Sequence, residues 1–302
     1  MTVLVTGATG NIGKHVVRGL VGAGQPVRAM TRTPESAATR LPAGVAIVAG
    51  DFEQPATWEP ALAGVDRVHL FPFADPAPAA GPSFIEVAVA AGVRRFVVHS
   101  AAAAGFDYLG EPDDLSLSAL DRHLADERQW HLSLEQAVAA SGAEWTHVRP
   151  GLLATWALAW ADEIRTTGTV RAPFPQAGNP LVHEADVAEV AVAALITDAH
   201  LGQVYTITGP TKITQEEQVR EIGVALGREL RLVELTPEAA RQEWLDPAQG
   251  MDDELLDWLL PTIELGLAPG GAVPATGDFE RITGRPPRTF AQWARDHVED
   301  FR

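Results

Sequence analysis

A glycine-rich turn near the amino terminus is the feature that most constrains the fold of this chain. It lies between a short apolar run, residues 3–5, and an amphipathic segment, residues 12–21. In a strand–turn–helix unit, the first glycine permits a tight turn and the second lets backbone N–H groups approach a pyrophosphate. The third lets the helix pack close to the sheet, and the positive end of the helix dipole faces the anion. The residues predicted to bind a dinucleotide here are Gly7, Thr9, Gly10, Asn11, Ile12 and Gly13. The alternative is a structural turn that binds no ligand.

Short apolar runs alternate with helix-like segments over the first half of the chain. The expected strands are 3–5, 26–30, 45–48, 67–70, 96–99 and 145–148, and the expected helices are 12–21, 34–40, 56–62, 84–91 and 119–140. This alternation is typical of βαβ units, whose parallel strands are buried on both faces. We therefore predict an α/β fold with a Rossmann-type doubly wound parallel sheet over residues 1–150. A smaller α/β substrate domain is expected over residues 151–302, partly interleaved with the first. It has expected helices at 152–165, 184–197, 214–226, 252–260 and 290–298, and an expected strand at 203–208.

Charge and composition exclude several classes of protein. The 302 residues include 40 Asp and Glu, 23 Lys and Arg and no Cys, and the formal net charge is −17. An acidic chain opposes contact with nucleic-acid phosphates and anionic membranes, and the lack of cysteine excludes thiolate catalysis. No signal peptide precedes the first apolar run, and the longest apolar stretch, 152–161, is too short to cross a bilayer. We expect a cytoplasmic protein, monomeric or homodimeric, that binds a small-molecule substrate and neither nucleic acid nor membrane.

The residues after the second and third expected strands bear on the choice of cofactor. Sites selective for NAD usually place an acidic residue near the end of the second strand, where it binds the ribose 2′-hydroxyl. Here Arg32 follows that strand, and a guanidinium pairs well with a 2′-phosphate. We therefore predict NADP rather than NAD; a solvated surface arginine is the alternative. Asp51 and Phe52 end the third strand, where a carboxylate and a backbone N–H can meet the adenine, although a helix cap or a turn also explains Asp51.

Several segments resemble the short-chain dehydrogenase/reductase superfamily, and within it the atypical NmrA-like branch that includes triphenylmethane reductase and a quinone oxidoreductase. The resemblance is carried by VTGATGNIG at 5–13, RAMTR at 28–32, GD at 50–51, RFVVHS at 95–100, SGAEWTHVRPG at 141–151, DVA at 186–188 and ITGRPP at 282–287. It covers nearly the whole chain. It implies a Rossmann domain with the cofactor across the carboxyl ends of the strands. By position, the residues that it places beside the nicotinamide are Phe71, Pro72, Ser100, Pro150 and Gly151.

The proton donor of typical superfamily members is missing from this chain. Those members carry Tyr-x-x-x-Lys on one helix face, where the lysine lowers the tyrosine pKa and the tyrosine exchanges a proton with a carbonyl oxygen. This chain has two lysines, Lys14 and Lys212, and two tyrosines, Tyr108 and Tyr205, and no pair has that spacing.

A histidine occupies a position where NmrA-like relatives often keep a lysine. His131 matches that position, with Glu135 one helical turn further along. We therefore assign catalytic roles to Ser100 and His131, since histidine can donate to a ribose hydroxyl or act as a general acid near neutral pH. A surface histidine and a serine bonded to nearby backbone are the alternatives.

Loss of the tyrosine need not abolish hydride transfer. Quinones, conjugated cations and activated enones stabilise the charge they receive, so they need orientation more than a proton donor. We predict an NADP-dependent oxidoreductase that reduces a small aromatic, quinone-like or conjugated carbonyl acceptor. The alternatives are a non-catalytic NAD(P)-binding regulatory or redox-sensing protein, and a non-redox isomerase or dehydratase.

Two further groups of residues have competing interpretations. We predict no metal site, because His183, Glu184 and Asp186 suit a helix start better than a metal cluster. The tryptophans that either line an aromatic pocket or pack in the core are Trp130, Trp156 and Trp160.

Overall fold

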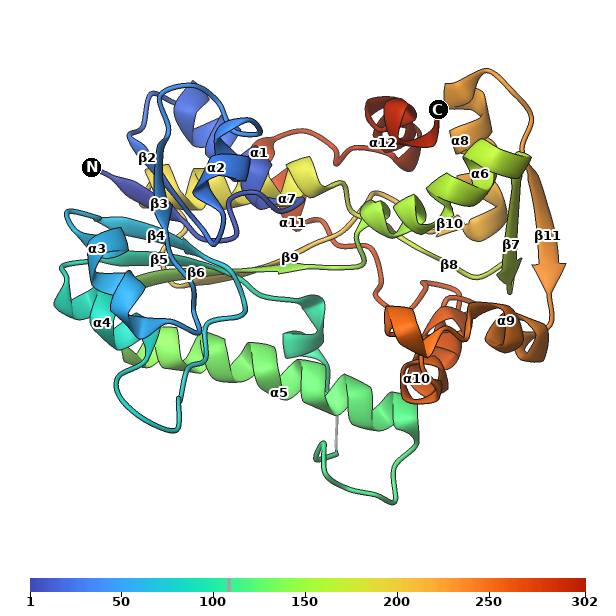
Figure 1. Cartoon of the computed structure of the whole chain (residues 1–302), viewed down its shortest axis with the longest axis horizontal. Helices are drawn as coiled ribbons and strands as arrows, with labels where there is room; N and C mark the ends of the chain where they lie inside the picture. The colour runs from blue at the N-terminus through green and yellow to red at the C-terminus, as the bar shows by residue number, and fades with distance from the viewer. Residues whose placement is uncertain (108–109) are drawn as a thin grey trace. The chain divides into compact units, whose positions relative to one another are not determined.

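The structure, a computed structural model, describes residues 1–107 and 110–302. It divides into two compact units, each assembled from separate stretches of chain (Figure 1). Unit 1 comprises residues 1–105, 128–150 and 184–207, and unit 2 comprises residues 106–127, 151–183 and 208–302. One of the crossings between the units therefore lies between Pro150 and Gly151.

Unit 1 is built on a seven-stranded parallel sheet. Its strands are β1 (Val3–Val5), β2 (Val27–Thr31), β3 (Ala46–Ala49), β4 (Arg67–Leu70), β5 (Arg95–His99), β6 (Glu144–Pro150) and β9 (Gln203–Ile207). Their order is β3-β2-β1-β4-β5-β6-β9. Successive strands run outward from β1 in one direction and from β4 in the other, which confirms the predicted doubly wound fold. Ligands of such sheets bind beyond the carboxyl ends of the strands, at this change of direction.

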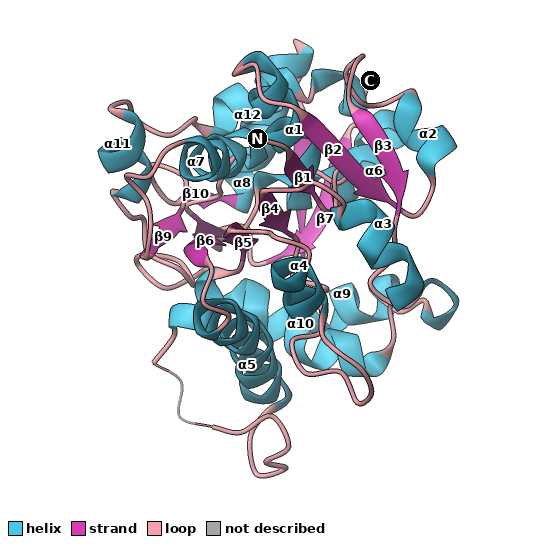
Figure 2. Ribbon diagram, turned by 90° about the vertical axis from the view of Figure 1, so that its left-hand side faces the viewer, coloured by secondary structure: helices cyan, strands magenta, loops and turns pink. Residues whose placement is uncertain are grey.

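Helices cover both faces of this sheet (Figure 2). They are α1 (Gly13–Gly22), α2 (Pro34–Ala38), α3 (Trp58–Leu62), α4 (Phe84–Ala90), α5 (Ala119–Ala140) and α7 (Glu184–Ile196), with short 3-10 helices η1 (Pro55–Thr57) and η2 (Ala102–Gly105). Helices α1 and α7 lie side by side on one face, and α3, α4 and the unit 1 part of α5 pack on the other. The second face buries one continuous apolar cluster, including Leu70, Phe84, Phe96 and Leu134. Each such side chain contributes roughly 1.5–3 kcal/mol relative to an exposed one.

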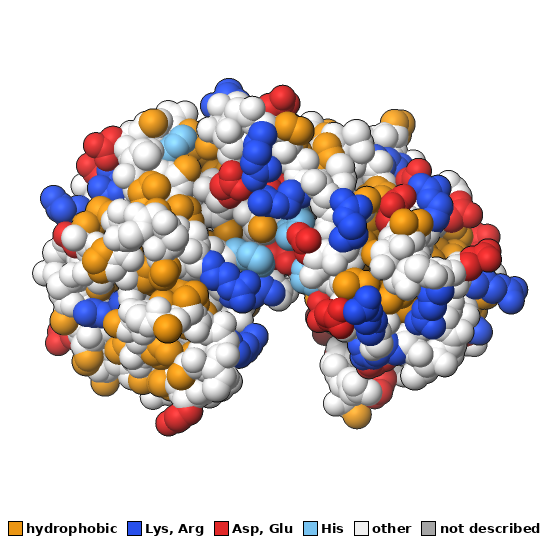
Figure 3. Space-filling view, turned by 90° about the horizontal axis from the view of Figure 1, so that it is seen from above, with side chains coloured by type: hydrophobic (Ala, Val, Ile, Leu, Met, Phe, Trp, Pro, Cys, Tyr) orange, Lys and Arg blue, Asp and Glu red, His pale blue; other side chains and the backbone are white. Residues whose placement is uncertain are grey.

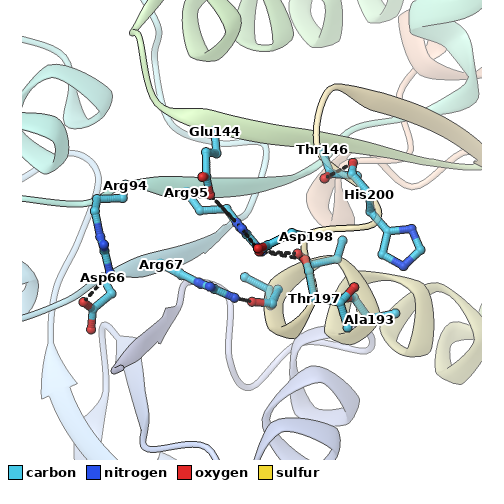
Figure 4. Close-up of polar contacts among 12 residues, drawn as sticks. Asp66, Arg67, Arg94, Arg95, Glu144, Thr146, Ala193, Thr197, Asp198 and His200 are labelled. Carbon is cyan, nitrogen blue, oxygen red and sulfur yellow. Dashed lines mark hydrogen bonds and ion pairs between the residues drawn. The ribbon is translucent and has the colours of Figure 1, made fainter.

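Hydrogen bonds from the buried Arg95 hold the carboxyl end of α7 at the amino edge of the sheet (Figure 4). Arg95, at the start of β5, is 1% exposed. Its guanidinium donates to the Thr197 carbonyl at 2.6 Å, to Asp198 Oδ1 at 2.5 Å and to Glu144 Oε2 at 2.8 Å. A cation is favourable at the negative end of a helix, so this cluster stabilises the docking of α7. It lies at the opposite edge of the sheet from the glycine turn.

Unit 2 combines helices with two small sheets. Its elements are η3 (Ala154–Trp160), α6 (Ala161–Thr167), β7 (Thr169–Pro173), β8 (Gly178–Asn179), β10 (Ile213–Thr214), α8 (Gln215–Leu226), β11 (Arg231–Leu235), α9 (Pro237–Trp244), η4 (Pro247–Gln249), α10 (Asp253–Leu265), α11 (Asp278–Thr283), α12 (Phe290–Asp296) and η5 (Val298–Phe301). Strands β7 and β11 pair in parallel, and β8 and β10 pair antiparallel. The core of the unit includes Ile164, Ile222, Trp293 and Phe301.

The segment 152–165 departs from the expected continuous helix. Residues 154–160 form a 3-10 helix, and only from Ala161 does the chain become α-helical. The start of the segment is drawn into a bridge between Leu153 and Val182, and the Ala154 N–H donates to the Val182 carbonyl at 2.9 Å. This long-range pairing competes with the first helical turn.

The start and end of α8 confirm a local prediction. Thr214 is the N-cap, and its side chain accepts from the Glu217 N–H while the Glu217 carboxylate accepts from the Thr214 N–H. Gly227 ends the helix in the left-handed conformation, with φ of 68°. Both signals are local, so the sequence alone predicts them.

The surface shows no segregation of charge on the face drawn in Figure 3, where basic and acidic side chains are interspersed. Among the described residues, no helix combines the length and the hydrophobicity that crossing a bilayer requires.

Candidate functional site

The glycine turn between β1 and α1 closes tightly on itself. Gly7 has a φ of 62°, and the Gly10 N–H donates to the Gly7 carbonyl at 3.0 Å. A Cβ at Gly13 would lie 2.1 Å from the Gly7 oxygen, which no side chain can tolerate. Gly13 therefore lets the helix begin against the backbone of the turn, rather than against the sheet as we had expected.

The amino end of α1 is open to an anion. In the described part of the chain, no side chain caps this end of the helix, where Ile12 occupies the N-cap position. The N–H groups of Lys14, His15 and Val16 already donate to the carbonyls of Gly10 and Ile12. The backbone N–H groups just before them are the ones that a ligand can use, and the helix dipole favours a negative acceptor there. A Cβ at Gly10 would come near the Gly7 oxygen, at 3.2 Å, and near no other described atom within 4 Å, so this position leaves room for the acceptor. The residues present therefore fit the pyrophosphate of a dinucleotide.

Two arginines flank the turn. Arg32 is exposed and follows β2 directly, and β2 is the neighbour of β1 in the sheet. Arg40, just beyond α2, donates from Nη2 to the Thr9 carbonyl at 3.1 Å. Arg32 is predicted from the sequence but Arg40 is not, because 31 residues separate Arg40 from the carbonyl that it binds.

The carboxylate of Asp51 serves a turn after β3. Its oxygens accept from the Glu53 N–H at 3.1 Å and from Gln54 Nε2 at 3.3 Å. The Asp51 carbonyl accepts from Trp58 Nε1 at 2.7 Å. The neighbouring Phe52 packs edge-on against Phe84, with 5.1 Å between ring centroids. The turn alternative therefore accounts for the carboxylate of Asp51, and the ring of Phe52 belongs to the apolar cluster.

Phe71 packs directly on the glycine turn. A Cβ at Gly7 would lie 2.9 Å from Phe71 Cγ, and the Phe71 N–H donates to Thr6 Oγ1 at 2.7 Å. The carbonyl of the next residue, Pro72, accepts from Trp130 Nε1 at 2.8 Å. The residues after β4 thus lie beside the turn, and Trp130 of α5 holds them there.

A buried polar cluster joins α5 to the carboxyl ends of β5 and β6. Arg149 donates to both oxygens of Glu135, from Nε at 2.8 Å and from Nη2 at 2.6 Å. His147 Nδ1 lies 3.3 Å from the same carboxylate. Ser100 is buried at the end of β5, and its N–H donates to the Val148 carbonyl at 2.8 Å. The structure therefore brings Ser100 and Glu135 into one cluster. Arg149 and His147, which complete it, are not predicted as site residues from the sequence.

The same cluster fixes the ionisation of Glu135. Burial by itself raises the pKa of this carboxyl, but hydrogen bonds from Arg149 and His147 outweigh burial and hold the pKa at about 2. The carboxylate is therefore charged near neutral pH, and it orients Arg149 through a bidentate contact. His131, one turn earlier on α5, is buried.

Two further histidines are buried under this edge of the sheet. Burial lowers the pKa of His69, on β4, to about 4. Burial, together with the neighbouring His69 and His131, lowers the pKa of His99, on β5, to about 3. The rings of His69 and His99 are 6.1 Å apart, and His99 also contacts Phe71. Both side chains are therefore neutral at physiological pH.

The other two residues predicted beside the nicotinamide, Pro150 and Gly151, stand at the carboxyl end of β6. Pro150 ends β6 in unit 1, and Gly151 belongs to unit 2. The Tyr205 hydroxyl lies 2.9 Å from His200 Nδ1, and Tyr108 lies outside the described residues. Lys14 is in α1 of unit 1.

The acidic and histidine residues around the start of α7 form no metal centre. His183 Nε2 lies 3.3 Å from Asp296 Oδ2, and Glu184 and Asp186 are buried in the first turn of the helix. Among the described residues, no group of three or more His, Asp or Glu side chains is placed to hold a metal ion.

Trp156 and Trp160 line a cavity of about 640 Å³ that is formed wholly by residues of unit 2. Trp156 is 56% exposed, so it is not a core residue. Trp130, in contrast, lies in unit 1.

Comparisons with known proteins agree with this geometry. Residues 7–198 match the model of an NAD(P)H-binding family. The chain is 38% identical to the (4-alkanoyl-5-oxo-2,5-dihydrofuran-3-yl)methyl phosphate reductase of Streptomyces griseus and 33% identical to the NAD(P)H azoreductase of Xenophilus azovorans, over 99% of both chains in each pair.

Solved structures share the fold over nearly the whole chain. The NADPH complex of an Escherichia coli quinone oxidoreductase is 23% identical with a TM-score of 0.72, over 98% of this chain and 99% of that one. A Citrobacter triphenylmethane reductase is 18% identical with a TM-score of 0.72, over 99% and 100% of the two chains.

Proposed function

The chain belongs to the NAD(P)H-binding family and is an oxidoreductase, and we propose that it transfers hydride from NADPH to a conjugated acceptor without a tyrosine proton donor. One observation carries the proposal: the glycine turn closes so tightly that only glycine fits at Gly13, and it leaves the amino end of α1 open to a pyrophosphate. Bound there, NADPH supplies the hydride.

Two cations support a preference for NADPH over NADH. Arg32 follows β2, and Arg40 is anchored on the Thr9 carbonyl of the turn. One carbonyl bond leaves most of the five guanidinium N–H donors of Arg40 for an anion. No acidic residue stands at the end of β2, where it would repel a 2′-phosphate. Arg32 and Arg40 therefore favour the phosphorylated cofactor, NADPH.

The names of the relatives support a conjugated acceptor. The Streptomyces griseus protein is named for a substrate in which a ring alkene is flanked by an oxo and an alkanoyl group, and the Xenophilus azovorans protein is an azoreductase. The curated relatives also include an Escherichia coli quinone oxidoreductase, 28% identical over 96% of this chain. Acceptors of these kinds delocalise the incoming charge. Their reduction therefore depends on orientation more than on a proton donor.

The polar cluster at the ends of β5 and β6 supports roles for Ser100 and His131 in hydride transfer. Glu135 holds the guanidinium of Arg149 in one orientation, and Ser100 lies beside the same carboxylate. We assign Ser100 to orienting the nicotinamide or the acceptor, and His131 to proton donation where the acceptor needs one. Unit 2, with its aromatic cavity, is assigned to binding the substrate.

The decisive experiment follows NADPH oxidation at 340 nm with a quinone, an azo dye and an unsaturated lactone as acceptors. We expect turnover with at least one acceptor, and we expect Tyr108→Phe and Tyr205→Phe to retain most of it. Removal of a general acid would lower kcat by roughly 10²–10⁴-fold. Gly13→Ala serves as the control that abolishes cofactor binding.

Three results would overturn the proposal. Loss of turnover in either tyrosine variant would show that a tyrosine is the proton donor after all. NADPH binding without oxidation of NADPH in the presence of any acceptor would indicate a regulatory protein. Conversion of a substrate with no net NADPH consumption would indicate an isomerase or dehydratase.

A further inference from the structure

The cavity of unit 2 has an aromatic wall. Trp156 and Trp160 of η3 and Trp244 of α9 line it, together with Met251 and residues of α10. Its volume of about 640 Å³ lies in the range of sites for small molecules, roughly 300–1,000 Å³. Trp160 and Trp244 are half-buried and also pack against core residues. Trp156 is exposed, and a large exposed ring beside a cavity suits contact with an apolar or planar ligand.

Among the described residues, the one basic side chain that lines this cavity is already paired with a carboxylate. Arg171 is the basic residue among its lining residues, and the carboxylate of Glu243 accepts from both Nε and Nη2 of Arg171, the first at 2.9 Å. The Arg171 N–H also donates to Glu163 Oε2 at 3.2 Å. Glu163 and Asp246 line the cavity as well. The guanidinium is therefore already neutralised, and two carboxylates remain to repel an anion.

Two of the amide side chains that line the cavity are held by hydrogen bonds to backbone carbonyls. Gln215 Nε2 donates to the carbonyls of Pro173 and Phe174 at 2.7 and 2.9 Å, and Gln218 Nε2 donates to the Ile213 carbonyl at 3.1 Å. These bonds hold both side chains in place. The discrimination against an anion therefore rests on the carboxylates of Glu163 and Asp246 rather than on a lack of donors.

We propose that the aromatic cavity of unit 2 binds an uncharged aromatic molecule and discriminates against an anionic molecule of the same shape. As a statement about the hydride acceptor, this inference rests on the proposed function. As a statement about binding, it concerns unit 2 alone and needs no cofactor chemistry.

Two fluorescent probes of matched shape test the discrimination. N-phenyl-1-naphthylamine is uncharged, and 1-anilinonaphthalene-8-sulfonate is the same skeleton with a sulfonate. Both are titrated into the full chain with excess NADP⁺ present, so that neither reports on the nucleotide site. We expect the uncharged probe to bind at least about tenfold more tightly, which corresponds to about 1.4 kcal/mol.

Substitutions in unit 2 assign the binding to this cavity. Ala159→Trp adds bulk at an exposed lining position and should weaken binding of the uncharged probe by roughly tenfold or more. Val224→Trp adds the same side chain at an exposed position of α8 outside the cavity, and it should leave binding unchanged. Trp156→Leu removes an exposed ring and provides a second test that does not depend on added bulk.

One variant should gain binding. Glu243→Gln removes the partner of Arg171, and it should strengthen binding of the sulfonate probe by a factor of about three or more while changing the uncharged probe little. Equal affinity of the two probes in the wild-type protein would overturn the proposal. So would unchanged binding of the uncharged probe in both Ala159→Trp and Trp156→Leu. None of these results depends on NADPH oxidation, so they are distinct from a failure of the proposed function.

Discussion

Replacement of Glu135 by glutamine tests the buried cluster at the ends of β5 and β6. The carboxylate accepts two hydrogen bonds from Arg149 and lies 3.3 Å from His147. Glutamine keeps the shape of the side chain but removes its charge and one acceptor. The Arg149 side chain, 15% exposed, then keeps its charge with little water to solvate it.

The size of the effect follows from the pKa of Glu135. The fold lowers this pKa from 4.5 to about 2. That difference favours the charged form by about 3 kcal/mol. Breaking a buried ion pair by removing one partner typically costs roughly 3–5 kcal/mol. Because Arg149 retains some exposure, we expect Glu135→Gln to lower the free energy of unfolding by about 3 kcal/mol at pH 7.

Urea unfolding at pH 7 measures this change directly. Glu59→Gln, an exposed position on α3, is the matched control and should change the stability by no more than about 0.5 kcal/mol. The double variant Glu135→Gln with Arg149→Met should be less unstable than Glu135→Gln alone, because it leaves no buried charge.

The pH dependence of the stability difference between wild type and Glu135→Gln tests the same reasoning. A carboxyl with a depressed pKa contributes stability that is complete above about pH 4.5 and is lost as the pH falls toward 2. The difference between wild type and Glu135→Gln should therefore shrink on acidification below pH 5. A loss under about 1 kcal/mol at pH 7, or a difference that grows on acidification, would refute the reasoning.

The remaining predictions concern the turn, the buried histidines and the amino edge of the sheet. Gly13→Ala places a Cβ 2.1 Å from the Gly7 oxygen, so NADPH binding measured by calorimetry should be lost. His69 and His99 have folded pKa values of about 4 and about 3, below the unfolded value of 6.5, so the unfolded chain takes up protons first as the pH falls. The stability that these histidines contribute is complete above pH 6.5, and the urea midpoint should fall steadily from pH 6.5 toward pH 4. Arg95→Met should lower the free energy of unfolding by about 1–3 kcal/mol, because the Thr197 carbonyl loses its donor while Asp198 and Glu144 are exposed enough to be solvated. NADPH affinity should stay unchanged, because Arg95 lies at the opposite edge of the sheet from the turn.

The features that local sequence predicts are those whose causes are local. The need for glycine at position 13 comes from Gly7, six residues earlier, and the caps of α8 at Thr214 and Gly227 depend on residues within about one turn. The strands of unit 1 were found within one or two residues, because runs buried on both faces are continuously apolar.

The features that the sequence does not predict depend on distant partners. Strands β7 and β11 are short and pair with each other across a long separation, so neither carries a strong signal alone. Arg40 reaches Thr9, Arg149 meets Glu135, and both contacts arise only when the sheet assembles. The carboxylate of Asp51 accepts hydrogen bonds within its own turn, as one of the two sequence interpretations expects. Its contact with adenine stays a prediction.

The central claim is that this chain binds NADPH through the glycine turn and its two flanking arginines. Parallel titrations with NADPH and NADH, followed by quenching of the eight tryptophans, test it most directly. We predict that NADPH binds at least about tenfold more tightly than NADH, and that Arg32→Gln and Arg40→Gln each narrow this ratio, whereas Arg18→Gln on the exposed side of α1 does not. Binding of neither nucleotide, or tighter binding of NADH, would contradict the account.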